Sequence, residues 1–199
     1  RRMGGYLKPV PSGIKGNIFG LGGSGSEWVA VGEGGAASRS SGAGFVAVPT
    51  DTRSALFGVV AVEGSVFAVG AGGTLQRYIR VDDRFTAMAS PTRALLYAAW
   101  GDRASNVYAV GSGGTLLHFD GSSWQSIATD TKQSLLDIWG SGPQDIYVVG
   151  SGGLVLHFDG KTWARVETGT RANLYGVHGR GSGDVFAVGE GGVVLHYQR

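Results

Sequence analysis

Apolar and polar residues alternate in short segments along this chain, and many of these segments end at glycine. Five of them end in Val followed by Gly-x-Gly-Gly, at residues 28–31, 66–69, 107–110, 146–149 and 185–188. Alternation with a period of two predicts β-strands, and Gly-rich tetrapeptides predict tight turns. The pattern therefore predicts strand-turn units that recur about every 40 residues.

Each unit contains signals for further strands. A second apolar run follows the turn, and two units then carry Asp-Gly, at Asp120-Gly121 and Asp159-Gly160, which is a strong hairpin signal. The next strand opens with an aromatic residue and the one after it with leucine; these residues are Phe45, Phe85, Trp124 and Trp163, then Leu56, Leu96, Leu135 and Leu174. Four short strands in about 40 residues are typical of a β-propeller blade.

Five turn motifs predict five blades in a single all-β domain, with four antiparallel strands per blade. The predicted blades are 16–53, 54–93, 94–132, 133–171 and 172–199, the last of them completed by residues 5–12. The last unit stops one strand short, whereas Leu7 and Val10 have the offsets of an outer strand. We therefore expect a closed five-bladed β-propeller in which the N-terminal strand pairs with the last blade and leaves no exposed sheet edge.

The strands predicted to lie nearest the propeller axis carry a small residue at their third position. These residues are Gly20, Gly58, Ala98 and Gly176, with Asp137 as the exception. Small side chains let neighbouring backbones approach closely. The aromatic residues of the same strands are predicted to fill the wedges between blades; they are Phe19, Phe57, Tyr97, Trp100, Trp139 and Tyr175.

Composition and charge narrow the classes of function. The formal net charge is only +2 and no run of basic residues occurs, which argues against a nucleic-acid partner. Apolar stretches such as 95–100 are far shorter than the ~20 residues that span a bilayer. The sequence also contains no motif for a cofactor, so we expect none.

The 199 residues include 37 glycines and no cysteine, and the chain begins at Arg1 rather than at methionine. A cysteine-free chain rich in Gly, Ser and Thr suits an oxidising exterior. We therefore expect an extracellular, periplasmic or cell-surface location, in a domain of a longer chain.

The most regular units read Leu135-Leu-Asp-Ile-Trp-Gly-Ser, then Asp145-Ile-Tyr-Val-Val-Gly, then Leu156-His-Phe-Asp-Gly-Lys-Thr-Trp163. They resemble the short Trp-Gly-Ser propeller repeats of secreted and surface-anchored bacterial proteins. They are also similar to the repeats of Ycf48-like photosystem assembly factors and, more distantly, to Asp-box blades of the sialidase type. The resemblance covers the whole chain, most strongly 94–199, and implies the propeller fold and an exported bacterial protein.

One cation per unit lies in the connection between an outer strand and the next inner strand. These cations are Lys15, Arg53, Arg93, Lys132 and Arg171. Such connections share one face of a propeller, so the cations are predicted to form a ring that attracts an anion or an acidic partner. The alternative is a repeated turn, in which Thr52, Thr92, Thr131 and Thr170 cap the backbone and each cation pairs with a local acid such as Asp51, Asp130 or Glu167.

Other polar residues favour structural roles. His118, His157 and His196 occur once in each of the last three units, where the first two units have Arg39 and Arg77. The histidines are too far apart to share a metal ion, and we expect each to bond to the backbone of a neighbouring blade. Asp137 is predicted to face the central channel as a solvated or hydrogen-bonded side chain. Because the acids are scattered and the connections are short, we expect no catalytic residues and no metal site.

The sequence therefore predicts a non-enzymatic binding or scaffolding module that docks a protein or a glycan on the face carrying the cations. A second hypothesis is a multivalent lectin that uses Trp100 and Trp139 as sugar platforms between blades. A third, less favoured hypothesis is a glycosidase that depends on Asp137.

Overall fold

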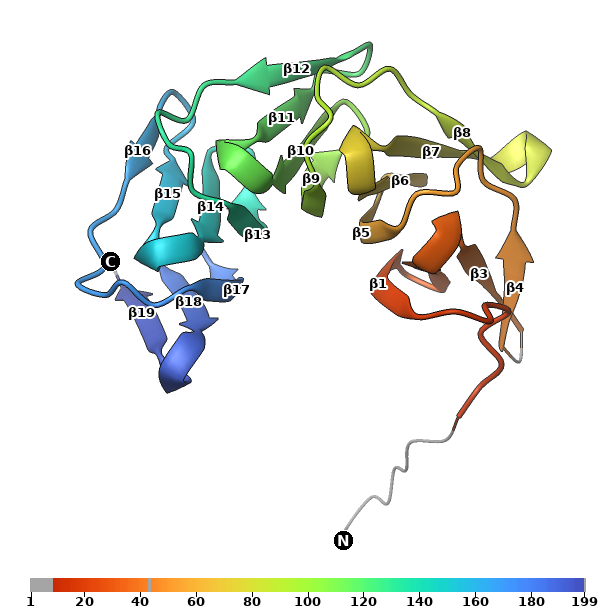
Figure 1. Cartoon of the computed structure of the whole chain (residues 1–199), viewed down its shortest axis with the longest axis horizontal. Helices are drawn as coiled ribbons and strands as arrows, with labels where there is room; N and C mark the ends of the chain where they lie inside the picture. The colour runs from red at the N-terminus through yellow and green to blue at the C-terminus, as the bar shows by residue number, and fades with distance from the viewer. Residues whose placement is uncertain (1–8, 43, 199) are drawn as a thin grey trace, which may run out of the picture.

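The computed structural model describes residues 9–42 and 44–198, which form five antiparallel sheets standing side by side in an arc (Figure 1). We call these sheets blades 1 to 5 in chain order. Blades 1 to 4 have four strands each and blade 5 has three. The first strand of each blade lies on the concave side of the arc (Figure 1). The repeated all-β architecture is thus confirmed, and no helix in the described ranges is long and apolar enough to cross a membrane.

The strands are short, as the alternating pattern predicted. Blade 1 contains β1 (Ile18–Ser24), β2 (Glu27–Gly32), β3 (Ala37–Ser41) and β4 (Gly44–Val48); blade 2 contains β5 (Leu56–Val62), β6 (Ser65–Gly70), β7 (Leu75–Ile79) and β8 (Arg84–Ala87). Blade 3 contains β9 (Leu96–Arg103), β10 (Asn106–Gly111), β11 (Leu116–Phe119) and β12 (Trp124–Ile127). Blade 4 contains β13 (Leu135–Gly142), β14 (Asp145–Gly150), β15 (Val155–Phe158) and β16 (Trp163–Arg165). Blade 5 contains β17 (Leu174–Gly181), β18 (Asp184–Gly189) and β19 (Val194–Gln198).

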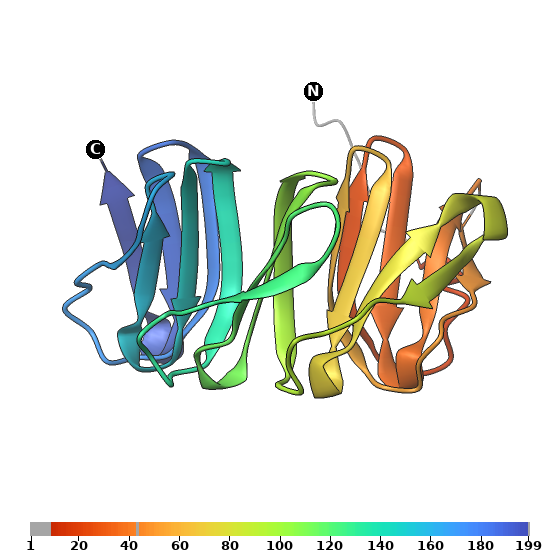
Figure 2. The same ribbon diagram turned by 90° about the horizontal axis from the view of Figure 1, so that it is seen from above.

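Each Gly-x-Gly-Gly motif forms a short 3-10 turn between the second and third strands of its blade. These turns are η1 (Glu33–Gly35), η2 (Ala71–Gly73), η4 (Ser112–Gly114), η5 (Ser151–Gly153) and η6 (Glu190–Gly192); η3 (Arg80–Asp82) instead joins β7 to β8. The five motif turns gather on one side of the arc, which we call the turn face (Figure 2). A Cβ atom on Gly73 would lie 2.0 Å from the carbonyl oxygen of Thr92. The connections between blades therefore share the turn face with these turns.

The core consists of apolar layers between successive blades. Alternate residues of β6 point in opposite directions, so that Val66 and Ala68 pack towards blade 1, whereas Phe67 and Val69 pack towards blade 3. The aromatic residue that opens an outer strand joins the layer towards the preceding blade, as Trp124 of β12 does between blades 2 and 3. Each interior blade thus has two buried faces, which is why adjacent blades stabilise one another.

Small residues on the inner strands let neighbouring blades touch, as predicted. A Cβ atom on Gly20 would lie 2.6 Å from the carbonyl oxygen of Phe57, and one on Gly58 would lie 2.9 Å from the Cα atom of Ala98. Real Cβ atoms do not approach other heavy atoms so closely. The backbone contacts between these inner strands therefore require the absence of a larger side chain.

Asp137 breaks this pattern and bridges the inner strands of blades 4 and 5. Its Oδ2 atom accepts a hydrogen bond of 2.9 Å from the backbone N–H of Val177 in β17. Burial raises the pKa of the Asp137 carboxyl above its ordinary value, and the bond from Val177 offsets part of that effect. This is the hydrogen-bonded role expected for Asp137, although its partner lies in the next blade.

The raised pKa predicts how Asp137 affects stability. The folded state holds the carboxyl proton more tightly than the unfolded chain, so stability is lost as pH rises from the ordinary value through the raised pKa. We expect Asp137→Asn to be more stable than the wild type at pH 7, with a difference that shrinks towards pH 4. Asp137→Ala should cost about 1–3 kcal/mol, because it leaves the Val177 N–H unpaired. Urea unfolding at pH 7 and pH 4 measures the free energy of unfolding of these variants relative to the wild type. A stabilisation by Asp137→Asn that grows as the pH falls would contradict the prediction.

The arc is open, which corrects the predicted closure of the ring. Pro11 accepts a backbone hydrogen bond of 3.0 Å from Phe45 in β4. Residues 9–12 therefore lie along the outer strand of blade 1, not along blade 5, while residues 5–8 of the predicted closing strand lie outside the described residues. The packed side chains between blades set the angle from one blade to the next, and five such blades do not complete a circle (Figure 1).

Candidate functional site

Each inner strand carries a β-bulge at its second residue, near the turn face. In β5 the pairing with β6 shifts between Leu56 and Gly58, so Phe57 has no residue opposite it. The same irregularity recurs in all five inner strands, and the extra residues are Phe19, Phe57, Tyr97, Leu136 and Tyr175. A bulge turns a side chain away from the regular ladder. The local backbone therefore aims one large apolar side chain per blade out of its sheet.

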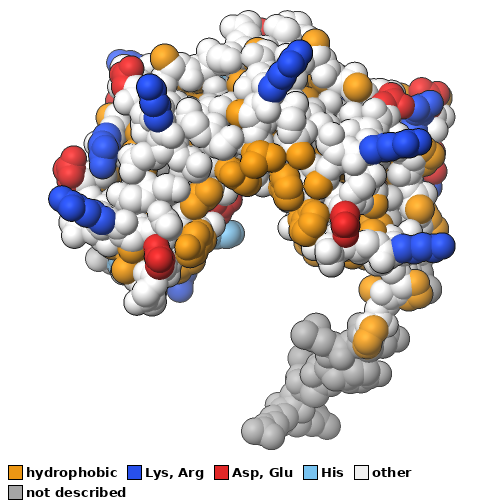
Figure 3. Space-filling view, in the orientation of Figure 1, with side chains coloured by type: hydrophobic (Ala, Val, Ile, Leu, Met, Phe, Trp, Pro, Cys, Tyr) orange, Lys and Arg blue, Asp and Glu red, His pale blue; other side chains and the backbone are white. Residues whose placement is uncertain are grey.

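We call these five bulged residues the concave row. The rings of Phe19 and Phe57 lie 5.3 Å apart and those of Phe57 and Tyr97 lie 6.4 Å apart, measured between centroids. Phe19 is 46% exposed and Tyr175 is 57% exposed. Apolar side chains gather along the concave edge of the molecule (Figure 3). The sequence analysis placed Phe19, Phe57, Tyr97 and Tyr175 inside the wedges between blades, whereas the structure places them, together with Leu136, in a row that solvent reaches.

The predicted cations surround this row on the turn face. Lys15, Arg53, Arg93, Lys132 and Arg171 are all exposed, and each precedes a residue of the concave row by four positions. Lys and Arg side chains are spaced around this face of the arc (Figure 3). Within the ranges that the structure describes, none of the five forms an ion pair or a side-chain hydrogen bond. Their charges are therefore available to a partner.

The threonines that precede four of these cations hold the connections in shape. Their Oγ1 atoms accept hydrogen bonds of 3.0–3.1 Å from the backbone N–H two residues later; the pairs are Thr52 with Ser54, Thr92 with Ala94, Thr131 with Gln133 and Thr170 with Ala172. This matches the capping turn of the alternative hypothesis. The ion pairs that the alternative hypothesis expected do not match the structure, because Asp51 pairs with Arg84 of β8 instead of with Arg53.

Among the motif turns, only those at the two ends of the arc carry a carboxylate that opposes the positive potential of the cations. Glu33 in η1 accepts hydrogen bonds from the backbone and side-chain nitrogens of Asn17, at 3.3 and 3.2 Å, and Glu190 occupies the same position in η6. The turns of blades 2 to 4 have Ala71, Ser112 and Ser151 at this position. Positive potential on the turn face is therefore least opposed over the middle of the arc.

The repeated histidines are structural, but their partners differ from those expected. In each case Nε2 lies 2.7–2.8 Å from a side-chain oxygen at the start of the second strand of the same blade; the pairs are His118 with Asn106, His157 with Asp145 and His196 with Asp184. The His118 ring also stacks on Tyr108, 4.5 Å away, and burial lowers the pKa of His118. In the described part of the chain, no group of three potential metal ligands occurs.

The two tryptophans proposed as sugar platforms each cover a glycine of the following blade. A Cβ atom on Gly140 would lie 2.6 Å from the indole of Trp100, and one on Gly179 would lie 2.5 Å from the indole of Trp139. Both tryptophans are half-buried. One face of each ring is therefore occupied by the next blade, which leaves the lectin hypothesis without a specific structural observation in its favour.

No protein-family model and no curated protein sequence matches this chain. Solved structures do match it. YCF48 from Cyanidioschyzon merolae is 19% identical, with a TM-score of 0.71, over 97% of this chain and 72% of its own. A structure of YCF48 bound to D1 peptide is 16% identical, with a TM-score of 0.71, over 96% of this chain and 66% of its own.

Two other solved structures match in the same way. The RRP9 WD40 repeats are 12% identical, with a TM-score of 0.79, over 94% of this chain and 64% of that one. A virginiamycin B lyase from Staphylococcus aureus is 11% identical, with a TM-score of 0.73, over 91% of this chain and 69% of that one. Identities this low show the fold alone. The chain therefore has the β-propeller fold, in an arc that spans about two thirds of the length of these structures.

Proposed function

We propose that this chain is a non-catalytic docking module that binds a partner protein through the concave row and the cations around it. One observation carries the proposal. At the same end of every inner strand, a cation that forms no ion pair with the described residues precedes a bulged apolar residue by four positions. Large apolar side chains supply contact area, and surrounding charges select the partner and speed its approach.

The partner that fits this surface is a polypeptide segment with acidic and aromatic residues. Acidic side chains would meet Arg93 and Lys132, whose connections pack against the motif turns of blades 2 to 4, where no carboxylate opposes them. Aromatic or aliphatic side chains would extend the row formed by Phe57 and Tyr97. That a YCF48 structure holds a peptide supports a propeller of this kind as a peptide-binding surface.

The hydrogen bonds of the carboxylates favour a binding role over catalysis. Asp120 accepts hydrogen bonds of 2.9 Å from the backbone N–H of Ser123 and of 2.7 and 2.8 Å from the hydroxyl and backbone N–H of Ser122, and these bonds lower the pKa of Asp120 to about 2. Asp159 does the same in the matching turn of blade 4. Since Asp137 is bonded to the backbone of blade 5, these acids maintain the fold. The proposal places the module in an exported bacterial protein, as the repeats and the absence of cysteine suggest.

Neutralising the cations tests this proposal. We expect the triple change of Arg53, Arg93 and Arg171 to alanine to weaken binding of fluorescein-labelled peptides rich in Asp, Glu and aromatic residues by about tenfold or more at low salt. Phe57→Ala with Tyr97→Ala should weaken binding with less effect on its salt dependence. Fluorescence anisotropy between 20 and 300 mM salt, values chosen for a strong change in screening, measures both effects.

Arg103 and Arg180 provide the matched control, because they lie at the opposite ends of the inner strands β9 and β17. Changing both to alanine should leave the peptide affinity unchanged. If this pair weakened binding as much as the triple change, attraction would depend on net charge alone and the turn face would not be the site.

A further inference from the structure

Three of the layers between blades contain an aromatic side chain supplied by an outer strand. These residues are Phe85 of β8, Trp124 of β12 and Trp163 of β16. Each stands opposite an aromatic residue of the third strand; the pairs are Phe85 with Tyr78, Trp124 with Phe119 and Trp163 with Phe158. In blade 5 the residue at the place of Phe158 is Tyr197, and no described strand pairs with β19 on that side.

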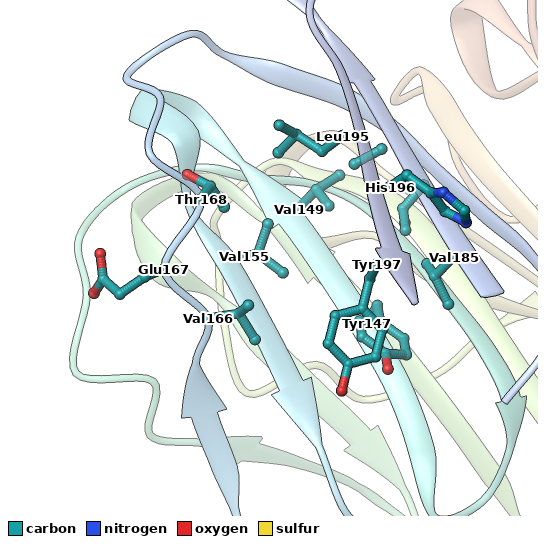
Figure 4. A pocket seen from close by; sticks show the side chains of 12 residues that line it. Tyr147, Val149, Val155, Val166, Glu167, Thr168, Val185, Leu195, His196 and Tyr197 are labelled. Atoms are coloured by element: carbon teal, nitrogen blue, oxygen red, sulfur yellow. The ribbon is translucent and has the colours of Figure 1, made fainter. Parts of the chain in front are cut away.

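A cavity of about 170 Å³ occupies the corresponding place between blades 4 and 5 (Figure 4). Its apolar lining includes Val149, Val155, Val166, Val185, Ala187 and Leu195. The residues 39 positions earlier pack around Trp163 in the layer between blades 3 and 4; they are Val110, Leu116, Ile127, Ile146, Val148 and Leu156. The cavity is therefore lined like the Trp163 site, without an aromatic side chain to fill it.

We propose that this cavity and the outer edge of β19 form an acceptor site for an extended segment of a partner protein. The segment would add to β19 as the fourth strand of blade 5 and insert one aromatic side chain into the cavity. Addition of a strand to an exposed sheet edge provides affinity through the backbone and specificity through side-chain pockets. This inference does not depend on the function proposed for the concave row.

The complete blades specify the sequence and direction of the incoming strand. In blade 3, Trp124 to Ile127 run antiparallel to β11, with Trp124 opposite Phe119 and Ile127 opposite Leu116. The matching acceptors in blade 5 are Tyr197 and Val194. Leu116 and Ile127 pack in the layer towards blade 4, whereas Val194 is 63% exposed because no blade follows blade 5 in the described structure. The partner strand should therefore carry its aromatic residue opposite Tyr197, on the face that lines the cavity, whereas the residue opposite Val194 lies on the face that no described blade covers.

The size and position of the cavity favour this occupant over a small molecule. Small-molecule sites usually enclose about 300–1,000 Å³, so 170 Å³ fits one large side chain better than a whole ligand. The cavity also adjoins β19, beside which no further strand lies among the described residues, and sheet edges of this kind attract extended peptides. Residues 9–12, which the sequence analysis assigned to this edge, lie along β4 of blade 1 instead.

A peptide copied from the outer strand of blade 4 provides the probe. Residues 160–168, Gly-Lys-Thr-Trp-Ala-Arg-Val-Glu-Thr, carry the required aromatic residue, Trp163. We expect the fluorescein-labelled peptide to bind the full chain saturably, and its Trp163→Ala version to bind at least tenfold more weakly. Hydrogen exchange should show new protection in β19. Equal affinities of the two peptides, or no binding at about 1 mM, would overturn the proposal.

Variants of the full chain locate the peptide. Ala187→Leu places added bulk in the cavity and should weaken binding at least tenfold, whereas Ala164→Leu, on the exposed outer strand β16, should not. The triple arginine change on the turn face should also leave this affinity unchanged. If Ala187→Leu does not fold, the affinities of the peptide and of its Trp163→Ala version for the unchanged chain still test the proposal.

Two further results would assign the site to another occupant and overturn the proposal. The first is peptide binding that appears only after residues 1–8 are removed, since those residues would then compete for the site. The second is a dimer, detected by light scattering, that the peptide dissociates, since a second copy would then be the partner.

Discussion

Replacing Phe67 with alanine is expected to lower the free energy of unfolding by about 3–5 kcal/mol. Phe67 is fully buried between blades 2 and 3, with its ring centroid 5.4 Å from that of Phe119 and 6.3 Å from that of Trp124. The change removes contacts with both the third and the outer strands of blade 3, and the packed neighbours cannot close the resulting cavity. Urea unfolding followed by tryptophan fluorescence measures the loss.

Phe186 is the matched control, because it has the same place in β18 that Phe67 has in β6. No blade follows blade 5 in the described structure, so Phe186 is 37% exposed and contacts chiefly the ring of His196. Phe186→Ala should therefore cost about 1 kcal/mol or less. Equal losses for the two variants would show that packing between blades is not the main source of stability.

Replacing Gly73 with alanine is expected to cost at least about 3 kcal/mol. Gly73 has a φ of +74°, and a Cβ atom there would lie 2.0 Å from the carbonyl oxygen of Thr92. Both the turn and the connection between blades 2 and 3 would have to move. The change should therefore lower the thermal midpoint strongly and shift hydrogen exchange in residues 90–95.

The variant Gly72→Ala separates the cost of the left-handed backbone conformation from the cost of the contact with Thr92. Gly72 has the same backbone conformation as Gly73 but lacks that contact. Its φ is +65°, and a Cβ atom there would have no atom within 4 Å. Gly72→Ala should cost only about 1–2 kcal/mol, the usual penalty for a left-handed alanine. If Gly72→Ala were as damaging as Gly73→Ala, the backbone angle rather than the contact with Thr92 would limit substitution in this motif.

The two proposed sites lie on different surfaces and demand different partners. The concave row and its cations suit an acidic segment that contacts several blades, whereas the acceptor site beside β19 suits one extended strand with a single aromatic anchor. A protein that carries both kinds of segment could engage both sites, and linkage would then raise its affinity beyond that of either segment alone.

The sequence alone was sufficient to predict the strands, the turns and the five repeated sheets. Alternating residues such as 107–110 and the following Gly-Ser-Gly-Gly act over a few positions, so their pattern is visible without knowledge of distant contacts. It also identified Arg53 and its equivalents as one cation per repeat. Their availability to a partner remained open, because it depends on whether an acid elsewhere in the chain is already engaged, as Asp51 is by Arg84.

Tertiary structure decided how the repeats are arranged and what they expose. The angle between blades arises from many side chains packed together, so the repeat length could not distinguish a closed ring from the open arc. The bulges that place Phe57 and Tyr97 in the concave row arise from pairing register between strands, which a single strand does not encode. The acceptor site beside β19 likewise exists only because blades 4 and 5 pack together without an outer-strand aromatic between them. Local chemistry determines the unit, and long-range packing determines its surfaces.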